Sequence, residues 1–521
     1  MVMLGTELNS VERGAHTALV IVTVPDNALI GESIVVSHGW WMNRPMHEVD
    51  IAIIGAGTAG MGSYRAALRH TDRLVLIEGG SYGTTCARVG CMPSKLLIAA
   101  AEAADAVREA AGFGVHAATP RIDGPEVMAR VRRERDRFIG FVLETVEGFD
   151  PSHRLRGCAR FEGPNTLRLD TGETVRAKRI VIATGSVPVR PDMFDAVGDR
   201  LIVSDDVFDW GELPDAVAVF GGGIIGLELA QALHRLGVRV RLFGKGGGVG
   251  PLSDPTVRDA AAAAIGADLP FDPDAEVQGI TREGDTVRVQ FTEDGAQREE
   301  RFDWLLAATG RAPALEGLDL AASGLTLDER GAPKIDPLTM QADGGHIFFA
   351  GDVAARIPLL HEVADDGRIA GDNAGRFPGV LTHRRRTPLG IVFTDPNIAT
   401  VGASFAELSD ASSDFEAGEV DFAEQGRARV LRQNRGLLRI YGERTTGRLL
   451  GAEMVAPRGE HLAHLLAWAV QAGMDVETAL EMPFYHPVIE EGLRTALRDL
   501  SVKLGRRTEN PPRSIDCGPG A

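Results

Sequence analysis

The feature that most constrains this fold is a glycine fingerprint, IAIIGAGTAG, between an apolar strand and a helix that we predict over 61–70. In such a unit the first glycine, Gly55, permits a tight turn. Gly57 lets backbone N–H groups approach a pyrophosphate, and Gly60 lets the helix pack closely on the strand. Glu78 ends the next predicted strand about 20 residues later, where a carboxylate can accept hydrogen bonds from ribose hydroxyls. This segment therefore predicts a dinucleotide-binding unit.

A second fingerprint, Gly221, Gly223 and Gly226, follows the apolar strand predicted over 216–220. It predicts a second dinucleotide-binding unit. The next predicted strand ends in Gly-Lys245, so the acid that would hold an adenosine 2′-hydroxyl is missing. Lys245 fits either a contact with a 2′-phosphate or a solvated surface charge, which leaves NAD and NADP open.

Two cysteines, Cys86 and Cys91, lie close together in GTTCARVGCMPSK. In a straight helix, five residues turn about 140° away from the starting face, so a disulfide requires an irregular segment. Gly83 and Gly90 allow that irregularity, and Pro93 suits the first turn of a following helix. Cys91 would then lie at a helix N-terminus, which stabilises a thiolate. The pair is our candidate redox centre.

Composition narrows the function classes. The 521 residues suggest roughly three units of about 150 residues. With 73 acidic and 55 basic side chains the formal charge is −18, which argues against nucleic acid and anionic membranes as partners. The early apolar run 17–24 is too short to span a bilayer, and four cysteines are too few for a secreted disulfide scaffold. We expect a cytoplasmic protein without a metal site.

Together, the motifs resemble those of the class I pyridine nucleotide-disulfide oxidoreductases, and within that family most closely the dihydrolipoamide dehydrogenases. The resemblance runs from residue 46 to about 503. Beside the two fingerprints, the second of which extends to GGGIIGLE, the motifs are GTTCARVGCMPSK (83–95), ATGS (183–186), ATGRAP (308–313), FAGD (349–352) and FYHPVIEE (484–491).

The resemblance implies FAD in the first site and NAD, with NADP not excluded, in the second. Asp352 would reach toward the ribityl chain of the flavin, and Lys95 and Glu228 would form an ion pair beside its reactive edge. The predicted cofactor-binding residues are Gly55, Gly57, Gly60, Glu78, Thr84, Lys95, Gly185, Ser186, Asp352, Gly221, Gly223, Gly226 and Gly310.

The patterns and the resemblance together predict an α/β fold with two Rossmann-like dinucleotide-binding domains and a C-terminal α+β dimerisation domain. The expected boundaries are a poorly ordered N-terminal extension (1–45), the first part of the FAD-binding domain (46–205), the NAD(P)-binding domain (206–334), the second part of the FAD-binding domain (335–385), the dimerisation domain (386–505) and a tail (506–521).

The resemblance also implies an obligate homodimer in which His486 completes the active site of the neighbouring subunit. A dithiol must lose protons before it can attack a disulfide, and a base that titrates near neutrality suits that task. Glu491 is placed to accept the other imidazole N–H, with the adjacent Glu490 as the alternative. The predicted catalytic residues are Cys86, Cys91, His486, Glu491, Lys95 and Glu228.

We therefore predict oxidation of dihydrolipoamide, as a small dithiol or on a lipoyl domain. The deprotonated dithiol would attack Cys86 in the oxidised pair, and Cys91 would pass the electron pair to the flavin. Whether the protein serves a 2-oxoacid dehydrogenase complex stays open.

Three departures from the family pattern leave the substrate open: Arg88 where many relatives have Asn, the missing second-site acid, and the divergent stretch 359–367. One alternative is an NADPH-dependent reductase of a low-molecular-weight disulfide such as glutathione. Another is a flavoprotein with a mainly structural role in a 2-oxoacid dehydrogenase complex. Mercuric reduction and thioredoxin reduction through a C-terminal cysteine pair are disfavoured, because the tail contains only Cys517.

Overall fold

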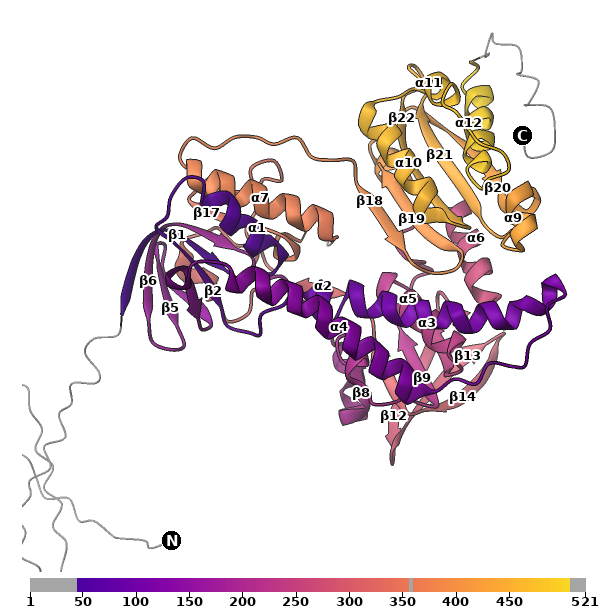
Figure 1. The fold of residues 1–521 in the computed structure, drawn as a ribbon, viewed down its shortest axis with the longest axis horizontal. Helices are drawn as coiled ribbons and strands as arrows, with labels where there is room; N and C mark the ends of the chain where they lie inside the picture. Colours follow the sequence, from indigo (N-terminus) through magenta and orange to yellow (C-terminus); the bar gives the residue numbers. More distant parts are fainter. Residues whose placement is uncertain (1–44, 356–358, 507–521) are drawn as a thin grey trace, which may run out of the picture.

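The computed structural model describes residues 45–355 and 359–506. Nearly all of the predicted N-terminal extension and tail, together with Cys517, lie outside these residues. Three sheets organise the fold (Figure 1): a first nucleotide-binding sheet at one end, and a second nucleotide-binding sheet and a C-terminal sheet at the other. Helices α3 (Cys91–Glu109) and α4 (Gly124–Glu147) run between them. This is the predicted arrangement of two nucleotide-binding units and a C-terminal α+β unit.

The first sheet has a parallel core, in which β1 pairs with β2 on one side and β6 on the other. Ile51, Ala52 and Ile53 are all fully buried, as expected for a strand covered on both faces. β17 joins the sheet from much later in the chain and pairs with β6. The strand order is β3 (Arg154–Arg156), β2 (Leu74–Glu78), β1 (Met46–Ile54), β6 (Thr174–Ile182), β5 (Thr166–Leu169) and β4 (Ala159–Gly163), with β17 (Ile347–Phe349) beside β6.

Two helices of this unit, α1 (Thr58–Ala67) and α7 (Leu360–Arg376), pack against each other closely. A Cβ atom at Gly367 would lie 2.3 Å from the Ala59 carbonyl oxygen, so the two backbones meet through glycine. α1 begins three residues before the helix predicted over 61–70, because Gly57 is its N-cap.

The second nucleotide-binding sheet is entirely parallel, and a three-stranded antiparallel sheet lies beside it. Helices α5 and α6 complete this unit, and the short antiparallel pair β7 and β16 leads into and out of it. The strands of the parallel sheet are, in order, β11 (Phe271–Asp272), β10 (Arg239–Phe243), β9 (Ala216–Phe220), β15 (Trp304–Ala307) and β8 (Leu201–Val203). The antiparallel sheet consists of β12 (Glu276–Glu283), β13 (Thr286–Glu293) and β14 (Ala296–Phe302). The remaining elements are β7 (Ser186–Pro188), β16 (Arg311–Pro313), α5 (Ile224–Arg235) and α6 (Pro255–Gly266).

The C-terminal unit is an antiparallel five-stranded sheet with helices α10 and α12 packed on it. Helix α10 begins at Gly459 and ends at Ala472, and its buried residues face this sheet. The elements are β18 (Leu389–Val392), β19 (Asn397–Gly402), β22 (Leu449–Ala456), β21 (Leu437–Glu443), β20 (Phe415–Asp421), α8 (Phe405–Asp410), α9 (Gly426–Leu431), α10 (Gly459–Ala472), α11 (Val476–Leu480) and α12 (Glu491–Lys503).

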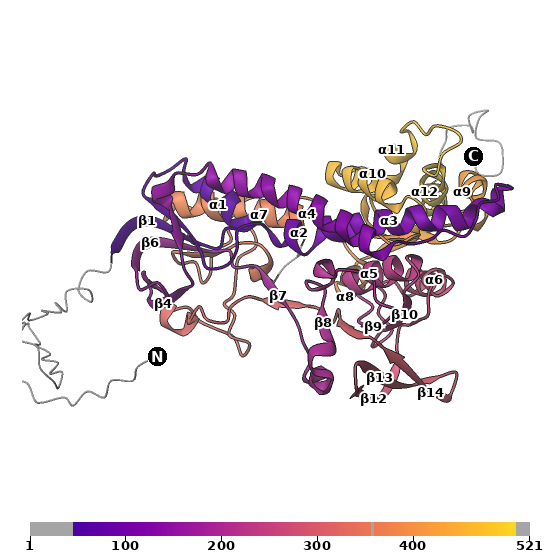
Figure 2. The same cartoon turned by 60° about the horizontal axis from the view of Figure 1, so that its bottom comes forward.

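Helix α3 belongs to a core that the second nucleotide-binding unit and the C-terminal unit share. Figure 2 shows α3 between the helices of the C-terminal unit and α5. Leu97 and Ala101 of α3 are buried in one apolar cluster with Leu229 of α5 and Ile398 of β19. The segment that carries the cysteine pair is therefore fixed by apolar packing to both of these units.

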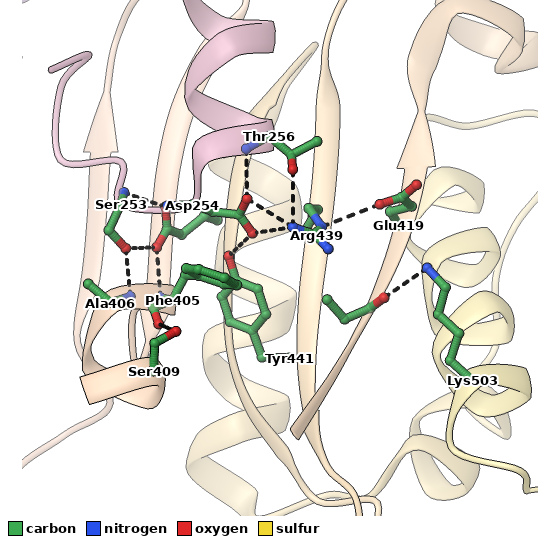
Figure 3. Close-up of polar contacts among 12 residues, drawn as sticks. Ser253, Asp254, Thr256, Phe405, Ala406, Ser409, Glu419, Arg439, Tyr441 and Lys503 are labelled. Atoms are coloured by element: carbon green, nitrogen blue, oxygen red, sulfur yellow. Dashed lines mark hydrogen bonds and ion pairs between the residues drawn. The ribbon is translucent and has the colours of Figure 1, made fainter. Parts of the chain in front are cut away.

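A buried polar network also joins these two units, at the start of α6 (Figure 3). Asp254 is fully buried and accepts hydrogen bonds from the Arg439 guanidinium and from the Tyr441 hydroxyl at 3.0 Å. Glu453, also fully buried, accepts from the backbone N–H groups of Asp254 and Phe405. Buried carboxylates of this kind persist only where donors satisfy them.

Candidate active site and nucleotide sites

The first glycine loop has the geometry of a phosphate-binding turn. Gly55 has φ +100°, and a Cβ there would lie 2.4 Å from the Ala183 carbonyl oxygen. A Cβ at Gly60 would lie 1.8 Å from the Gly55 carbonyl oxygen, so both positions require glycine. Gly57 caps α1 without a side-chain hydrogen bond, and the space above it is open. The N–H groups at this helix start are therefore accessible to a pyrophosphate.

Glu78 lies beside this loop, at the end of β2. Its carboxylate accepts hydrogen bonds from the backbone N–H of Ala56 at 2.8 Å and of Gly80 at 2.7 Å. A carboxylate has about four lone-pair sites, so it keeps the capacity to accept from ribose hydroxyls. The loop, the free helix start and this acid fit the adenosine and pyrophosphate of a dinucleotide.

The second glycine loop repeats the first. Gly221 has φ +119°, and its Cβ would lie 2.3 Å from the Ala308 carbonyl oxygen. A Cβ at Gly226 would lie 1.9 Å from the Gly221 carbonyl oxygen, and Gly223 is open. As in the first loop, the contacting carbonyl belongs to an Ala-Thr-Gly segment at the end of a neighbouring strand.

The two sites differ where an acid would hold the ribose. Gly244 follows β10, and a Cβ there would lie 2.5 Å from the Pro273 carbonyl oxygen, so this backbone excludes any side chain. Lys245 is exposed. The Asp274 carboxylate accepts a hydrogen bond from the Gly246 backbone N–H at 2.6 Å, which places a negative charge in the same loop.

The cysteine segment is irregular, as its spacing predicts. Cys86 lies in the one-turn helix α2 (Thr85–Arg88), whose start is capped by the Thr84 hydroxyl, accepting from Ala87 N–H at 3.2 Å. Cys91 is the first residue of α3, after the non-helical Gly90. Both cysteines are thiols here, close enough for a hydrogen bond between their sulfur atoms.

The two thiols differ in acidity. The hydrogen bond from Cys86, assisted by the charge of Lys95, lowers the pKa of Cys91 to about 7. The same hydrogen bond, together with burial, raises the pKa of Cys86 far above its ordinary value. When the reduced pair loses a proton near neutral pH, the negative charge therefore lies on Cys91, and Cys86 keeps its proton.

Lys95 and Glu228 form the predicted ion pair. Lys95 Nζ lies 2.7 Å and 2.9 Å from the carboxylate oxygens of Glu228, which is 4% exposed. Glu228 also accepts from Phe393 N–H at 2.9 Å, and the Lys95 ammonium lies 4.6 Å from the centroid of the Phe393 ring. The pair ties the helix of Cys91 to α5.

A second polar group lies where the first sheet meets the β7 and β16 pair. Ser186 Oγ donates to Asp352 Oδ2 at 2.6 Å and accepts from Arg311 Nε at 2.9 Å. Gly185 and Gly310 precede these strands with positive φ and open space around them. The structure thus brings together Ser186 and Asp352, two of the residues that we predict to bind the cofactor.

His486 and Glu491 form a hydrogen-bonded dyad. His486 Nδ1 lies 3.0 Å and 3.1 Å from the two oxygens of Glu491, whose side chain is 3% exposed, whereas that of His486 is 72% exposed. The predicted partner is therefore Glu491, while Glu490 is the N-cap residue of α12. With Nδ1 engaged, Nε2 is the atom that can exchange a proton with a substrate.

The dyad does not meet the cysteines within one chain. Helix α12 lies apart from α2 in both views (Figures 1 and 2). Large apolar side chains are exposed around the dyad and on the neighbouring helices, as expected for a surface that a second copy covers. They are Leu465, Trp468, Met482, Tyr485 and Val502.

The described residues contain neither a helix that could span a membrane nor a cluster suited to a metal ion. Between 45 and 506, apart from 356–358, none of the helices combines the length and apolar character needed to cross a bilayer. The same part of the chain contains no cluster of three or more His, Cys, Asp or Glu side chains arranged to hold a metal ion.

Comparison with known proteins gives the family. Residues 49–367 match the model of the pyridine nucleotide-disulphide oxidoreductases, and residues 389–497 match the dimerisation domain of these enzymes. The chain belongs to this family. Its members bind FAD and NAD(P), and this chain is accordingly an FAD-dependent disulfide oxidoreductase that forms a homodimer.

The relatives that match this chain include enzymes named for different substrates. The chain is 31% identical to a dihydrolipoyl dehydrogenase of Haloferax volcanii, over 86% of this chain and 95% of the relative. It is 32% identical to a mercuric reductase of Shigella flexneri, over 86% and 80%. It is 30% identical to a glutathione reductase of Burkholderia cepacia, over 82% and 93%.

A solved structure shows the same fold. LpdA from Mycobacterium tuberculosis superposes with a TM-score of 0.72 at 26% identity, covering 86% of this chain and 99% of LpdA. The family and the fold thus agree with the resemblance seen in the motifs.

Several residues of these sites have contacts that the sequence motifs do not indicate. The carbonyl groups of Ala183 and Ala308 close the two glycine loops, and the repeated Ala-Thr-Gly was an available signal for them. Arg311 lies within the ATGRAP motif (308–313), but the motif does not indicate its contact with Ser186. Phe393, which contacts Lys95, lies outside the motifs.

Proposed function

We propose that this enzyme oxidises dihydrolipoamide to lipoamide with NAD⁺, using Cys86 and Cys91 as its redox disulfide. The observation that carries the proposal is the unequal acidity of the two thiols, with the more acidic one at the start of α3 beside the Lys95–Glu228 pair. Such a pair suits transfer of two electrons from a dithiol on one side to a flavin on the other.

The proposed dithiol half of the reaction consists of two thiol–disulfide exchanges at Cys86. His486 of the second subunit takes a proton from one substrate thiol, and the resulting thiolate attacks the Cys86 sulfur of the disulfide. The S–S bond breaks, its electron pair goes to Cys91, and a mixed disulfide with Cys86 remains. The second substrate thiol then attacks the substrate sulfur of the mixed disulfide, and lipoamide is released. The proton of that thiol passes to the departing Cys86 thiolate, while His486 keeps the first proton.

Residues of this chain are proposed to support these steps. Lys95 and the start of α3 stabilise the departing Cys91 thiolate, and Glu491 keeps His486 oriented with Nε2 toward the substrate. Gly57, Glu78 and Asp352 are proposed to hold FAD. When bound, FAD supplies the two-electron relay between the cysteine pair and the pyridine nucleotide.

The second nucleotide site supports NAD rather than NADP. An adenosine 2′-phosphate needs positive charge, and guanidinium groups are the usual partners. Within the described part of this loop, the positive charge of the exposed Lys245 is offset by the negative charge of the Asp274 carboxylate. The arginines of β10 are already paired, Arg239 with Glu300 and Arg241 with Glu293.

The test compares substrates on the purified, FAD-loaded dimer. Initial rates are measured for dihydrolipoamide with NAD⁺ or NADP⁺, and for glutathione disulfide with NADH or NADPH. The highest kcat/KM for dihydrolipoamide with NAD⁺ supports the proposal. A higher value for glutathione disulfide with NADPH refutes it in favour of a low-molecular-weight disulfide reductase, and no turnover by the intact dimer favours a structural role.

Cysteine variants check the assignment within the same assay. Cys86→Ser and Cys91→Ser are each expected to lose dithiol oxidation, because either change prevents the disulfide from forming. Cys158→Ser is the matched control, since Cys158 lies on the surface and outside this segment. Retained turnover in Cys91→Ser contradicts the assignment.

A further inference from the structure

A buried arginine lies directly beneath the His486–Glu491 dyad. Arg494 comes one turn after Glu491 on α12, and its Nη2 lies 3.2 Å from Glu491 Oε1, the oxygen that also accepts from His486. The Arg494 and Glu491 side chains are 9% and 3% exposed, whereas the His486 side chain is 72% exposed. The exposed imidazole of His486 is therefore hydrogen-bonded to a carboxylate that forms a buried ion pair with Arg494.

Arg494 also contacts the segment that carries the histidine. Its guanidinium carbon lies 5.7 Å from the centroid of the Phe484 ring, two residues before His486. A second contact holds the same turn, because the Glu491 carboxylate accepts from the Val488 backbone N–H at 3.3 Å. One guanidinium thus touches both the carboxylate of the dyad and the chain that leads into its imidazole.

We propose that Arg494 is a positioning residue, which fixes the Glu491 carboxylate and weakens the pull of this carboxylate on the proton of His486. A guanidinium remains charged at every working pH, so it shares the negative charge of Glu491 with the imidazole. Without it, a buried and uncompensated carboxylate would hold an imidazolium more strongly.

The expected size follows from Coulomb's law. Arg494 Nη2 and His486 Nδ1 lie 3.2 Å and 3.0 Å from the same oxygen, Glu491 Oε1. At such a separation, in a medium of effective dielectric constant about 20 to 40, one charge displaces a protonation midpoint by roughly one pH unit. Salt screens this effect only in part, because Arg494 and Glu491 are buried.

Charged side chains on the elements packed against α12 have partners of their own. Beside Gly492, the packing comes from the uncharged Phe422 and Gln425. The charged side chains on β20, β21 and α11, the elements packed on α12, are engaged elsewhere in the described structure. They are Glu416 with Arg444, Glu419 with Arg439, Asp421 with the Ala423 N–H, Glu443 with Thr446, and Glu477 with Arg506; on α12 itself Asp499 pairs with Lys503.

This inference rests on the proposed function only for its kinetic consequence, so two readouts are needed. The first is the pH profile of kcat/KM for dihydrolipoamide oxidation, whose acidic limb reports the base of the free enzyme. The second is the pH midpoint of the His486 resonance in the FAD-loaded dimer, labelled with ¹³C at histidine and assigned with His486→Gln. The second readout does not depend on turnover.

Three variants are compared with the wild type. Arg494→Met removes the charge, Arg494→Lys keeps it, and Lys503→Met removes a charge from the far end of the same helix. Arg494→Met is expected to move both midpoints to higher pH by about one unit. Arg494→Lys and Lys503→Met are expected to leave them within a few tenths of a unit.

The outcomes separate the two proposals. Unchanged midpoints in a folded, flavin-loaded Arg494→Met dimer overturn the inference, as does an equal displacement in Lys503→Met. A displaced resonance with an unchanged rate profile supports the role of Arg494 and refutes His486 as the kinetic base. If Arg494→Met does not fold, Arg494→Gln takes its place, with Arg494→Lys as the rescue.

Discussion

The acidity of Cys91 depends first on its neighbour, so Cys86→Ala is the most informative single substitution. The hydrogen bond from Cys86 is the largest influence that lowers the pKa of Cys91 to about 7, and Lys95 contributes next. Its removal is expected to raise the pKa of Cys91 by roughly one unit, since Lys95 and the start of α3 remain. Adding Lys95→Met is expected to bring the pKa close to the ordinary thiol value.

These changes translate into reactivity. At pH 7, a thiol with a pKa of about 7 is about half thiolate, one at about 8 is about a tenth, and one at about 9 is about a hundredth. The rate of alkylation of Cys91 by iodoacetamide in the reduced enzyme is therefore expected to fall about fivefold in Cys86→Ala and about fiftyfold in the double variant.

Alkylation is followed from pH 5 to 10 by mass spectrometry of the peptide that contains Cys91, which separates it from the other cysteines. Cys158→Ala is the control, and its Cys91 profile is expected to match that of the wild type. If the profile of Cys91 in Cys86→Ala stays within a few tenths of a pH unit of the wild type, the hydrogen bond is not the cause of its acidity.

Three further predictions test other parts of the structure. Gly226→Ala places a methyl group against the Gly221 carbonyl oxygen, so we expect the enzyme to keep FAD but to lose binding of the pyridine nucleotide, measured by calorimetry; normal affinity contradicts the loop assignment. Glu453→Gln leaves buried N–H groups without acceptors, and we expect the free energy of unfolding in urea to fall by about 2–4 kcal/mol; no loss means that the network is not stabilising. Trp468 is exposed, and Trp468→Asp is expected to favour monomers in ultracentrifugation. Dithiol oxidation is expected to fall in proportion, because we propose that His486 acts in the site of a second chain; an active monomer refutes the shared site.

The sequence predicted those parts of the fold that depend on local pattern. Both glycine loops lie between strand and helix, and the irregular cysteine segment ends where α3 begins. Apolar spacing predicts the start of α1 three residues late, because the N-terminal boundary of this helix depends on the Gly57 cap and not on apolar spacing.

Contacts between distant segments left no such pattern. In the sequence, nothing distinguishes Asp254 and Glu453 from polar residues on the surface. Only the fold places them together in a buried network. Arg494 lies three residues from Glu491, yet a basic residue on an amphipathic helix is expected to face solvent, and burial alone distinguishes this one.

The contrast between the two glycine loops bears on how long each nucleotide stays. Both loops offer the same backbone cradle, but only the first has an acid, Glu78, where the second has Gly244 against the Pro273 carbonyl. One charge-assisted hydrogen bond contributes about 1.5–3 kcal/mol, or roughly a ten- to hundredfold difference in residence time if association rates are equal. A resident cofactor must outlast many turnovers, whereas a nicotinamide must leave after each one. The Pro273 carbonyl excludes an acidic side chain from the second site. The nucleotide bound there therefore exchanges more readily than the nucleotide in the first site.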